Sequence, residues 1–243
     1  MIEIKQMYAI LSRLPILQGM NGRDLALIQE MANEVHYTAQ LHPKPFIHAH
    51  TICNMLYFLA VGSLIRRITS PDGRFVMEEV LSAPAIIEPE SLYGLQCTFC
   101  CDYMAHTDAT LLVLSKQDAA LMVARNDIFR MNLLNHLSAH IQRLREQQMR
   151  PSSNEVWMRI GYMISDMSIS PVGTKTLRTK MDELADHLHE TRLTISRTLG
   201  MMEKHGLVEL RRREITVPDM KKLATCLTHG TMTPEQGSAK NNK

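Results

Sequence analysis

The C-terminal third of the chain contains two short helical patterns separated by a tight turn, and this pairing restricts the possible folds most. Met181–Leu188 spaces its apolar residues as an amphipathic helix does, and His189 and Glu190 follow as a turn. Thr191 is placed to cap a second helix that continues through Met202. The pattern predicts a helix-turn-helix.

Two short β runs follow the second helix and surround a basic turn. Gly206 is placed to end the helix, because glycine adopts the left-handed conformation of a helix C-terminus without strain. The runs LVEL and ITV then flank Arg211–Arg213. Together with the helix pair, they predict a winged helix-turn-helix that carries three arginines in its wing.

The two halves of the chain differ in charge, although the overall charge is only +2. Residues 1–150 contain 13 Lys/Arg and 14 Asp/Glu, a net charge of −1, whereas residues 151–243 contain 14 and 11, a net charge of +3. A cationic cluster on an otherwise neutral protein indicates a polyanionic partner bound at one place. We therefore expect the basic turn to contact nucleic acid.

The second helix has the composition that reading DNA requires. A recognition helix exposes small polar and cationic side chains near its start and buries its opposite face against the partner helix. Arginine pairs with guanine through two hydrogen bonds, and hydroxyl groups bind bases or phosphates. Arginines in a wing add affinity for the phosphate backbone, and this affinity depends on salt. The predicted DNA-binding residues are Thr191, Arg192, Thr194, Ser196, Arg197, Arg211, Arg212 and Arg213.

The N-terminal half begins with short helical patterns and continues as β structure. Asn21 is placed to cap a lead-in helix, and short apolar runs between turn residues follow from about residue 36 to residue 114. Pro71-Asp72-Gly73-Arg74 predicts a β-hairpin turn. We expect residues 1–150 to form a β-roll sensor domain that includes a long helix at its end. Residues 151–230 are the expected DNA-binding domain, and residues 231–243 a disordered tail.

The long helix follows the β runs and covers about twenty residues. A stripe of residues spaced four and three apart runs along it, as in a coiled coil. This stripe either covers the β roll or forms the seam of a homodimer. The predicted seam residues are Leu133, Leu137, His140 and Leu144.

The chain has five cysteines, three of which lie close together as Cys97, Cys100 and Cys101. An iron–sulfur cluster generally needs four thiolates, so these three are an incomplete set. They could instead be a redox-reactive thiol pair or ordinary cysteines of the roll. All three interpretations stay open at this point.

Several classes of protein do not fit the sequence. The N-terminus lacks the basic start and cleavage site of a signal peptide, and no apolar run is long enough to span a membrane, so we expect a cytoplasmic protein. No G-x-S-x-G, P-loop, H-E-x-x-H or dinucleotide fingerprint occurs, so we do not expect an enzyme. A dimeric interaction module that senses nothing is the alternative to an effector-responsive regulator.

The order of these parts resembles the Crp/Fnr family of bacterial transcriptional regulators. The similarity lies in VGSL, DGR, the long helix and above all ELADHLHETRLTISRTLGMMEKHGLVEL. It implies an α+β fold with a β roll like a cyclic-nucleotide-binding domain, a long dimerisation helix and a C-terminal winged helix-turn-helix. It also implies a homodimer on a palindromic operator in double-stranded DNA, with RNA polymerase as a partner. Arg192 and Arg197 match the family's basic recognition residues, whereas Leu193 replaces a base-reading Glu.

The effector site departs from the family pattern. Glu88 matches the family's ribose-binding Glu, but Ile87 replaces the preceding Gly, and no arginine occurs between Arg74 and Arg125 to pair with a cyclic phosphate. Cyclic AMP is therefore not the expected effector. The segment APAIIEPESLY is similar to regulators of nitrosative-stress genes, which implies haem and nitric-oxide sensing. Haem iron takes His, Met or Cys ligands, so Met77, His136 and His140 are candidate effector residues, and Glu88 is a further candidate through its match to the ribose-binding Glu.

Overall fold

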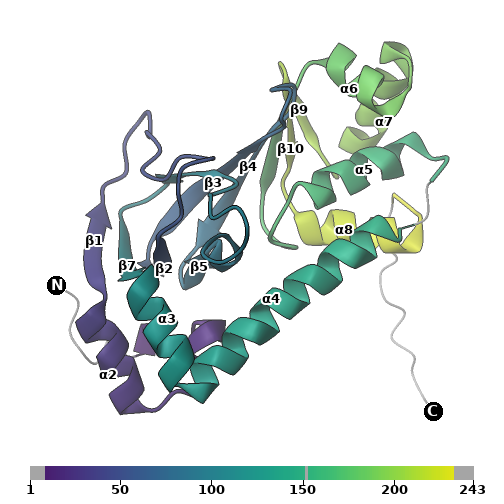
Figure 1. The fold of residues 1–243 in the computed structure, drawn as a ribbon. Helices are drawn as coiled ribbons and strands as arrows, with labels where there is room; N and C mark the ends of the chain where they lie inside the picture. The colour runs from purple at the N-terminus through teal and green to yellow at the C-terminus, as the bar shows by residue number, and fades with distance from the viewer. Residues whose placement is uncertain (1–8, 151–152, 233–243) are drawn as a thin grey trace, which may run out of the picture. The chain divides into compact units, whose positions relative to one another are not determined.

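A computed structural model describes residues 9–150 and 153–232 (Figure 1). The chain divides into two compact units, the first made of residues 1–66 with 80–150 and the second of residues 67–79 with 151–243. One division falls at the expected boundary after residue 150. Residues 67–79, expected in the first domain, are grouped with the second unit instead. Most of the expected disordered tail, residues 231–243, lies outside the described residues.

The first unit begins with the expected lead-in helices. The 3-10 helix η1 covers Pro15–Leu17 and the α-helix α2 covers Gly22–Met31. The Asn21 side chain accepts hydrogen bonds from the backbone N–H groups of Arg23 and Asp24, at 2.9 and 3.1 Å, and so caps α2 as predicted.

The first unit contains a four-stranded antiparallel sheet in the order β1-β7-β2-β5. The central strand β7 buries every residue from Ala109 to Leu114, as a strand covered on both faces does. Beside this sheet, β6 neighbours the start of β3. The strands are β1 (Asn33–Tyr37), β2 (Met55–Val61), β5 (Ala85–Ile87), β6 (Asp102–Ala105) and β7 (Ala109–Ser115).

The predicted hairpin joins β3 (Ser63–Thr69) to β4 (Val76–Ser82). Gly73 has a φ of 71°, the left-handed conformation that its turn needs, and its N–H donates to the carbonyl of Ser70 at 2.8 Å. The first half of β4 pairs with a strand of the second unit, β8 (Lys175–Arg178). This pairing is the physical reason why the hairpin is grouped with the second unit.

Two helices follow β7, as the sequence predicts. The helix α3 covers Lys116–Arg125 and α4 covers Asp127–Gln148, the latter over 22 residues. Ser115 and Asn126 cap the two helices with their side chains, and Asn126 also separates them. None of the helices within residues 9–150 and 153–232 is long and apolar enough to cross a membrane.

The second unit combines helices with a sheet in which the first half of β4 is followed by β8, β10 and β9. Trp157, Ile160, Leu199 and Leu223 are among the apolar residues of its core. Two elements of this unit were not predicted from the sequence, the strand β8 and the last helix, α8. The elements of this unit are α5 (Val156–Asp166), β8, α6 (Met181–Leu188), α7 (Arg192–Lys204), β9 (Glu209–Arg211), β10 (Glu214–Val217) and α8 (Met220–His229).

Candidate nucleic-acid interface

The turn between α6 and α7 is held by local hydrogen bonds. His189 ends α6 in the left-handed conformation, with a φ of 54°, and the N–H of Glu190 donates to the carbonyl of Ala185 at 2.9 Å. The Arg159 guanidinium donates to the carbonyl of Leu188 at 2.7 Å and forms an ion pair with Glu190. The predicted helix-turn-helix is therefore present, and α5 holds its turn in place.

The start of α7 is capped as predicted, so its first turn is well defined. Thr191 Oγ1 accepts the N–H of Thr194 at 3.1 Å and lies 2.8 Å from Thr194 Oγ1. The Thr191 hydroxyl thus has a structural partner in addition to its predicted role toward DNA. An anion at this end of a helix is also favoured by the exposed N–H groups and the helix dipole.

The two faces of α7 differ in the way a recognition helix requires. Ile195, Leu199 and Met202 are completely buried in the core of the second unit. The outward face combines hydroxyl, cationic and apolar groups. The exposed residues of its first two turns are Arg192, Leu193, Ser196 and Arg197, and Met201 follows on the same side.

The wing is a tight hairpin with its arginines at the end. Glu214 on β10 lies opposite Arg211 on β9, which leaves Arg212 and Arg213 as a two-residue loop. All three arginines are exposed, and Arg213 takes a φ of 61°. The predicted basic turn is therefore a compact cationic tip.

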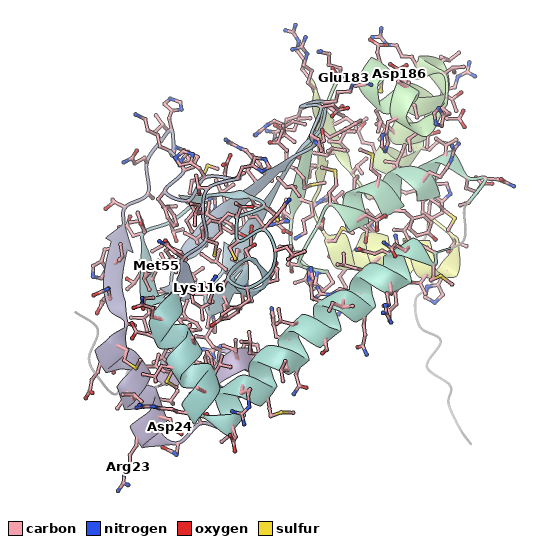
Figure 2. All side chains as sticks on the ribbon, in the orientation of Figure 1. Arg23, Asp24, Met55, Lys116, Glu183 and Asp186 are labelled. Atoms are coloured by element: carbon pink, nitrogen blue, oxygen red, sulfur yellow. The ribbon has the colours of Figure 1, made fainter. Side chains whose placement is uncertain are left out.

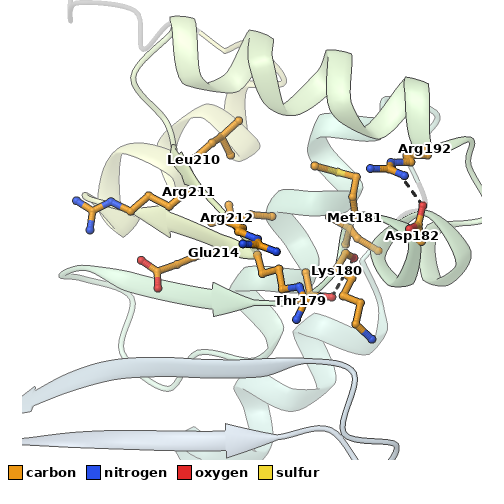
Figure 3. A pocket seen from close by; sticks show the side chains of 12 residues that line it. Thr179, Lys180, Met181, Asp182, Arg192, Leu210, Arg211, Arg212 and Glu214 are labelled. Atoms are coloured by element: carbon orange, nitrogen blue, oxygen red, sulfur yellow. Dashed lines mark hydrogen bonds and ion pairs between the residues drawn. The ribbon is translucent and has the colours of Figure 1, made fainter. Parts of the chain in front are cut away.

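A cavity of about 320 Å³ lies between this wing and the start of the helix pair (Figure 3). Its lining includes five cationic side chains and two acidic ones, so its net charge is positive. Arg192 lies on one side of it and pairs with Asp182 at 3.5 Å, where both side chains are largely exposed. The charged lining residues are Lys180, Asp182, Arg192, Arg211, Arg212, Arg213 and Glu214.

Lys180 belongs to this cationic lining, although it was not among the DNA-binding residues predicted from the sequence. Its backbone N–H and its ammonium both donate to the carboxylate of Glu183, at 3.1 and 2.7 Å. This arrangement fixes the start of α6 beside the cavity. Lys180 directly precedes α6, the first helix of the pair, and this position in the sequence could have indicated a cation close to the DNA-binding surface.

The comparisons with known proteins agree with this geometry. The profile of the Crp-like helix-turn-helix domain matches residues 159–226. This part of the chain is a Crp-like helix-turn-helix domain. No curated protein matches the chain in sequence.

Solved structures resemble nearly the whole chain at low sequence identity. The Catabolite Activator Protein of Thermus thermophilus is 20% identical with a TM-score of 0.50, and the match covers 89% of this chain and 99% of that one. A regulator assigned to the Crp/Fnr family from Eubacterium rectale is 20% identical with a TM-score of 0.51, with 88% and 98% covered. The c-di-GMP-responsive regulator CLP of Xanthomonas campestris is 17% identical with a TM-score of 0.50, with 82% and 99% covered.

These likenesses establish the architecture of both units. The chain has the fold of a Crp/Fnr-type DNA-binding transcriptional regulator, with an N-terminal β-sheet domain like the cyclic-nucleotide-binding domain of Crp. The predicted α+β fold class is thereby confirmed.

Of the predicted effector residues, Met77 belongs to the core of the second unit. Its side chain is completely buried and shares a cluster with Phe75 and Leu177. The pairing of Met77 with Leu177 across β4 and β8 explains this position. Met77 therefore does not fit the role of an iron ligand in this structure.

Glu88 is buried in the first unit and its carboxylate is occupied by the protein itself. One oxygen accepts the Ser91 hydroxyl at 3.0 Å and the Cys100 N–H at 2.7 Å, and the other accepts the Tyr103 hydroxyl at 3.1 Å. The negative charge of Glu88 is one reason, after burial itself, why the pKa of Tyr103 lies well above its usual range. The residue that resembles a ribose ligand thus serves as an internal anchor.

His136 and His140 are four residues apart on α4, so they lie on the same side of this helix. Both are partly buried. Burial lowers the pKa of His136, while the negative charge of Glu90 acts in the opposite direction. A neutral imidazole, the form that binds metals, is therefore favoured at His136.

The three cysteines that were considered for an iron–sulfur cluster are Cys97, Cys100 and Cys101. Among the described residues, no three His, Cys, Asp or Glu side chains come close enough together to hold a metal ion. Cys100 is exposed, its neighbour Cys101 is buried, and Cys97 is intermediate. Cys97, Cys100 and Cys101 thus lack the arrangement that a cluster site requires.

The predicted seam on α4 needs a correction at Leu133, which is only 7% exposed. This part of α4 packs against η1, where the Asn132 amide donates to the carbonyls of Ile16 and Gln18 at 3.2 and 2.8 Å. Leu133 therefore belongs to the core of its own unit. His140 is partly buried, whereas Leu134 and Ile141, which the sequence analysis missed, are 50% and 52% exposed.

Proposed function

We propose that this chain is a sequence-specific transcriptional regulator that binds double-stranded DNA as a homodimer at a palindromic operator. The observation that carries the proposal is the exposed cationic and hydroxyl face at the start of α7, beside three exposed wing arginines. DNA supplies the negative charge that this surface attracts. RNA polymerase is the proposed partner at the promoter.

In this proposal, α7 enters the major groove with its N-terminal half. Arg197 is exposed in the second turn of α7 and would pair with guanine through its two-pronged guanidinium. Ser196 lies beside it and would bind a base edge or a phosphate. Leu193 is 58% exposed on the same face and is suited to the methyl group of thymine.

The wing arginines would bind the phosphate backbone and not the bases. Arg212 and Arg213 form the tip of the hairpin, and Arg211 stands at the end of β9. Figure 3 labels Arg211 and Arg212. Contacts of this kind position a protein on the duplex and carry no sequence information of their own. Their contribution to affinity depends strongly on salt.

The proposed dimer forms through an exposed apolar stripe on α4. Leu134, Leu137, Ile141 and Leu144 follow one another at spacings of three, four and three residues, which is the coiled-coil repeat. Leu134, Ile141 and Leu144 are 46% to 52% exposed, an unusual state for three large apolar residues on one helix face. A second copy of α4 would cover them and place two recognition helices about 34 Å apart.

Haem is the effector proposed for the first unit, and His136 or His140 would supply a nitrogen ligand to its iron. The resemblance to nitrosative-stress regulators and the neutral imidazole favoured at His136 support this proposal. Haem titration should give a saturable Soret band that changes with nitric oxide and is lost in His136→Ala/His140→Ala. A spectrum without saturation, or one that the double variant leaves unchanged, would remove haem from the proposal.

DNA binding is tested by selecting duplexes from a randomised pool and measuring the affinity of the enriched sequence. Arg197→Ala should weaken this affinity by about 1–3 kcal/mol and relax the base preference at one position in each half-site. Arg23→Ala removes the same charge from α2 and serves as the matched control. The proposal fails if no sequence is enriched, or if both variants bind like the wild type.

A further inference from the structure

Two cysteines that are distant in the sequence lie opposite each other in a short antiparallel pairing within the first unit. Ile52 forms an antiparallel bridge with Thr98, and the backbone N–H of Cys53 donates to the carbonyl of Cys97 at 2.8 Å. On the other side of the bridge, the N–H of Phe99 donates to the carbonyl of Thr51 at 3.0 Å. This register pairs Cys53 directly with Cys97.

Residues directly opposite each other on antiparallel strands project their side chains to the same side. Hydrogen-bonded pairs of this kind have Cα atoms about 5.5 Å apart, within the 4.4–6.8 Å that a disulfide spans. The neighbouring Ile52 is 75% exposed, whereas Cys53 is 1% exposed, so the side chains alternate as a strand requires. Both cysteines are free thiols in the structure.

The two thiols differ in accessibility and in their neighbours. Cys53 Sγ faces the carbonyl of Met55 at 3.5 Å, and burial raises the pKa of its thiol to about 11. Cys97 is partly exposed, and the Lys116 ammonium donates to its sulfur at 3.3 Å. Lys116 also lies 5.5 Å from the centre of the Tyr93 ring.

Lys116 is held at this place by the sheet. Ser115, the residue before it, pairs with Met55 across β7 and β2, and the Lys116 N–H donates to the carbonyl of Asn54 at 2.9 Å. Figure 2 labels Lys116 and Met55 at these adjoining ends of α3 and β2. The cation is therefore a fixed part of the cysteine pair's surroundings.

We propose that Cys53 and Cys97 are a reversible redox pair, with Cys97 as the thiol that a peroxide oxidises first and Cys53 as the resolving thiol. The Cys97 sulfur attacks one peroxide oxygen, the O–O bond breaks, and Cys97 sulfenic acid and water form. The Cys53 sulfur then attacks the sulfenic sulfur, and the S–S bond forms with loss of a second water. Two thiols lose two electrons in total, and the peroxide gains them.

The local geometry assigns each partner its role. The thiolate is the form of a cysteine that attacks, and the ammonium of Lys116, 3.3 Å from the Cys97 sulfur, is placed to stabilise its negative charge. Cβ atoms in hydrogen-bonded cross-strand pairs are about 5 Å apart, slightly more than an unstrained disulfide prefers. A strained disulfide is easily reduced, which suits a reversible switch.

The other cysteines are less suited to this reaction. Cys100 and Cys101 are adjacent in the chain, one exposed and one buried, and the bridge between Ile52 and Thr98 places neither of them opposite Cys97. Cys226 is buried in the core of the second unit. The register therefore selects Cys53 as the partner of Cys97, although the sequence places Cys100 and Cys101 nearer.

The test treats the full-length reduced protein with a small excess of hydrogen peroxide and then blocks free thiols with a maleimide under denaturing conditions. The number of free thiols should fall from five to three, and a non-reducing digest should contain one Cys53–Cys97 cross-linked peptide. Added dithiothreitol should restore all five thiols. This readout does not involve DNA, so it stands apart from the proposed operator binding.

Three variants make the experiment decisive. Cys97→Ser should abolish the cross-link, Cys226→Ser should leave it intact, and Lys116→Met should slow its formation about threefold or more. Cys97 is only partly buried, so its serine variant leaves the core intact. A cross-link between other cysteines, or five free thiols after peroxide, would overturn the proposal.

Discussion

The ammonium of Lys175 on β8 forms an ion pair with the carboxylate of Glu79 on β4, and the two side chains are only 1% and 3% exposed. The backbone N–H groups of Ile169 and Ser170 donate to the same carboxylate at 3.1 and 3.4 Å. A buried charge needs such partners, because removal from water is costly and an unpaired ion cannot recover that cost. This pair therefore fixes the hairpin strand to the sheet of the second unit.

Removal of one member of this pair should destabilise the second unit. Lys175→Met removes the ammonium that is paired with the buried Glu79 carboxylate, and we expect the free energy of unfolding to fall by about 3–5 kcal/mol. The double variant Lys175→Met/Glu79→Leu should recover most of this loss, since neither charge of this pair is then left buried without the other. Urea unfolding followed by circular dichroism measures both, and a double variant as unstable as Lys175→Met would contradict the explanation.

Loss of the wing arginines should reduce the salt dependence of DNA binding. Replacement of Arg211, Arg212 and Arg213 by Ala should lower the slope of log affinity against log salt concentration by about 2–3 in magnitude. Affinities for a selected operator, measured at several salt concentrations, give this slope. Arg23→Ala should leave it unchanged, and an unaltered slope in the triple variant would place the phosphate contacts elsewhere.

Leu193 should determine one base of the operator. Its exposed side chain suits the thymine methyl group, whereas a carboxylate at this position accepts a hydrogen bond from the amino group of cytosine. Leu193→Glu should therefore shift the preferred base from thymine toward cytosine by about 1–3 kcal/mol. Selection from randomised duplexes with both proteins tests this shift, and identical selected sequences would exclude Leu193 from base reading.

The two neighbouring leucines of α4, Leu133 and Leu134, should affect different properties, Leu134 the dimer and Leu133 the stability of the fold. Leu134→Lys/Ile141→Lys should convert a dimer to a monomer in analytical ultracentrifugation, because two exposed seam residues become charged. Leu133→Ala should keep the dimer but lower the free energy of unfolding by about 2–5 kcal/mol, since Leu133 is a core residue. A wild-type protein that is monomeric, or a double Lys variant that remains dimeric, would refute this seam.

His136 should make the stability of the protein sensitive to mild acid. Burial lowers its pKa in the folded state from the usual 6.5, so the unfolded chain binds a proton more readily. Stability should therefore be fully present above about pH 6.5 and fall as the pH drops below it. Urea unfolding at about pH 7.5 and about pH 5.5 should show a smaller loss in His136→Gln, and equal losses would remove His136 as the cause.

Local patterns predicted the elements that short-range physics determines. Asn21 and Thr191 cap helices because their side chains bind N–H groups two or three residues ahead. The glycine at position 73 predicted a hairpin turn because glycine adopts a positive φ without strain, and Gly73 has a positive φ in the structure. The helix α7 and the basic wing followed from the same kind of information, which is why their residues could be selected before the fold was known.

Long-range pairing determined what the sequence did not reveal. The heptad spacing alone could not show that Leu133 is buried and Leu134 exposed. This difference arises because η1 packs against the side of α4 that carries Leu133 and leaves Leu134 uncovered. Met77 became a core residue only through its pairing with Leu177, and Lys175 became buried only beside Glu79. The register that joins Cys53 to Cys97 links segments more than forty residues apart.

The internal hydrogen bonds of Glu88 have a consequence for any small molecule that would use this carboxylate. Such a molecule must compete with Ser91, Cys100 and Tyr103, which are present at high effective concentration because they belong to the same chain. Its apparent affinity is reduced by the fraction of time in which these groups release Glu88. Groups of the protein itself therefore compete with any ligand for the Glu88 carboxylate. Binding of a ligand there would require the segment around Cys100 to move.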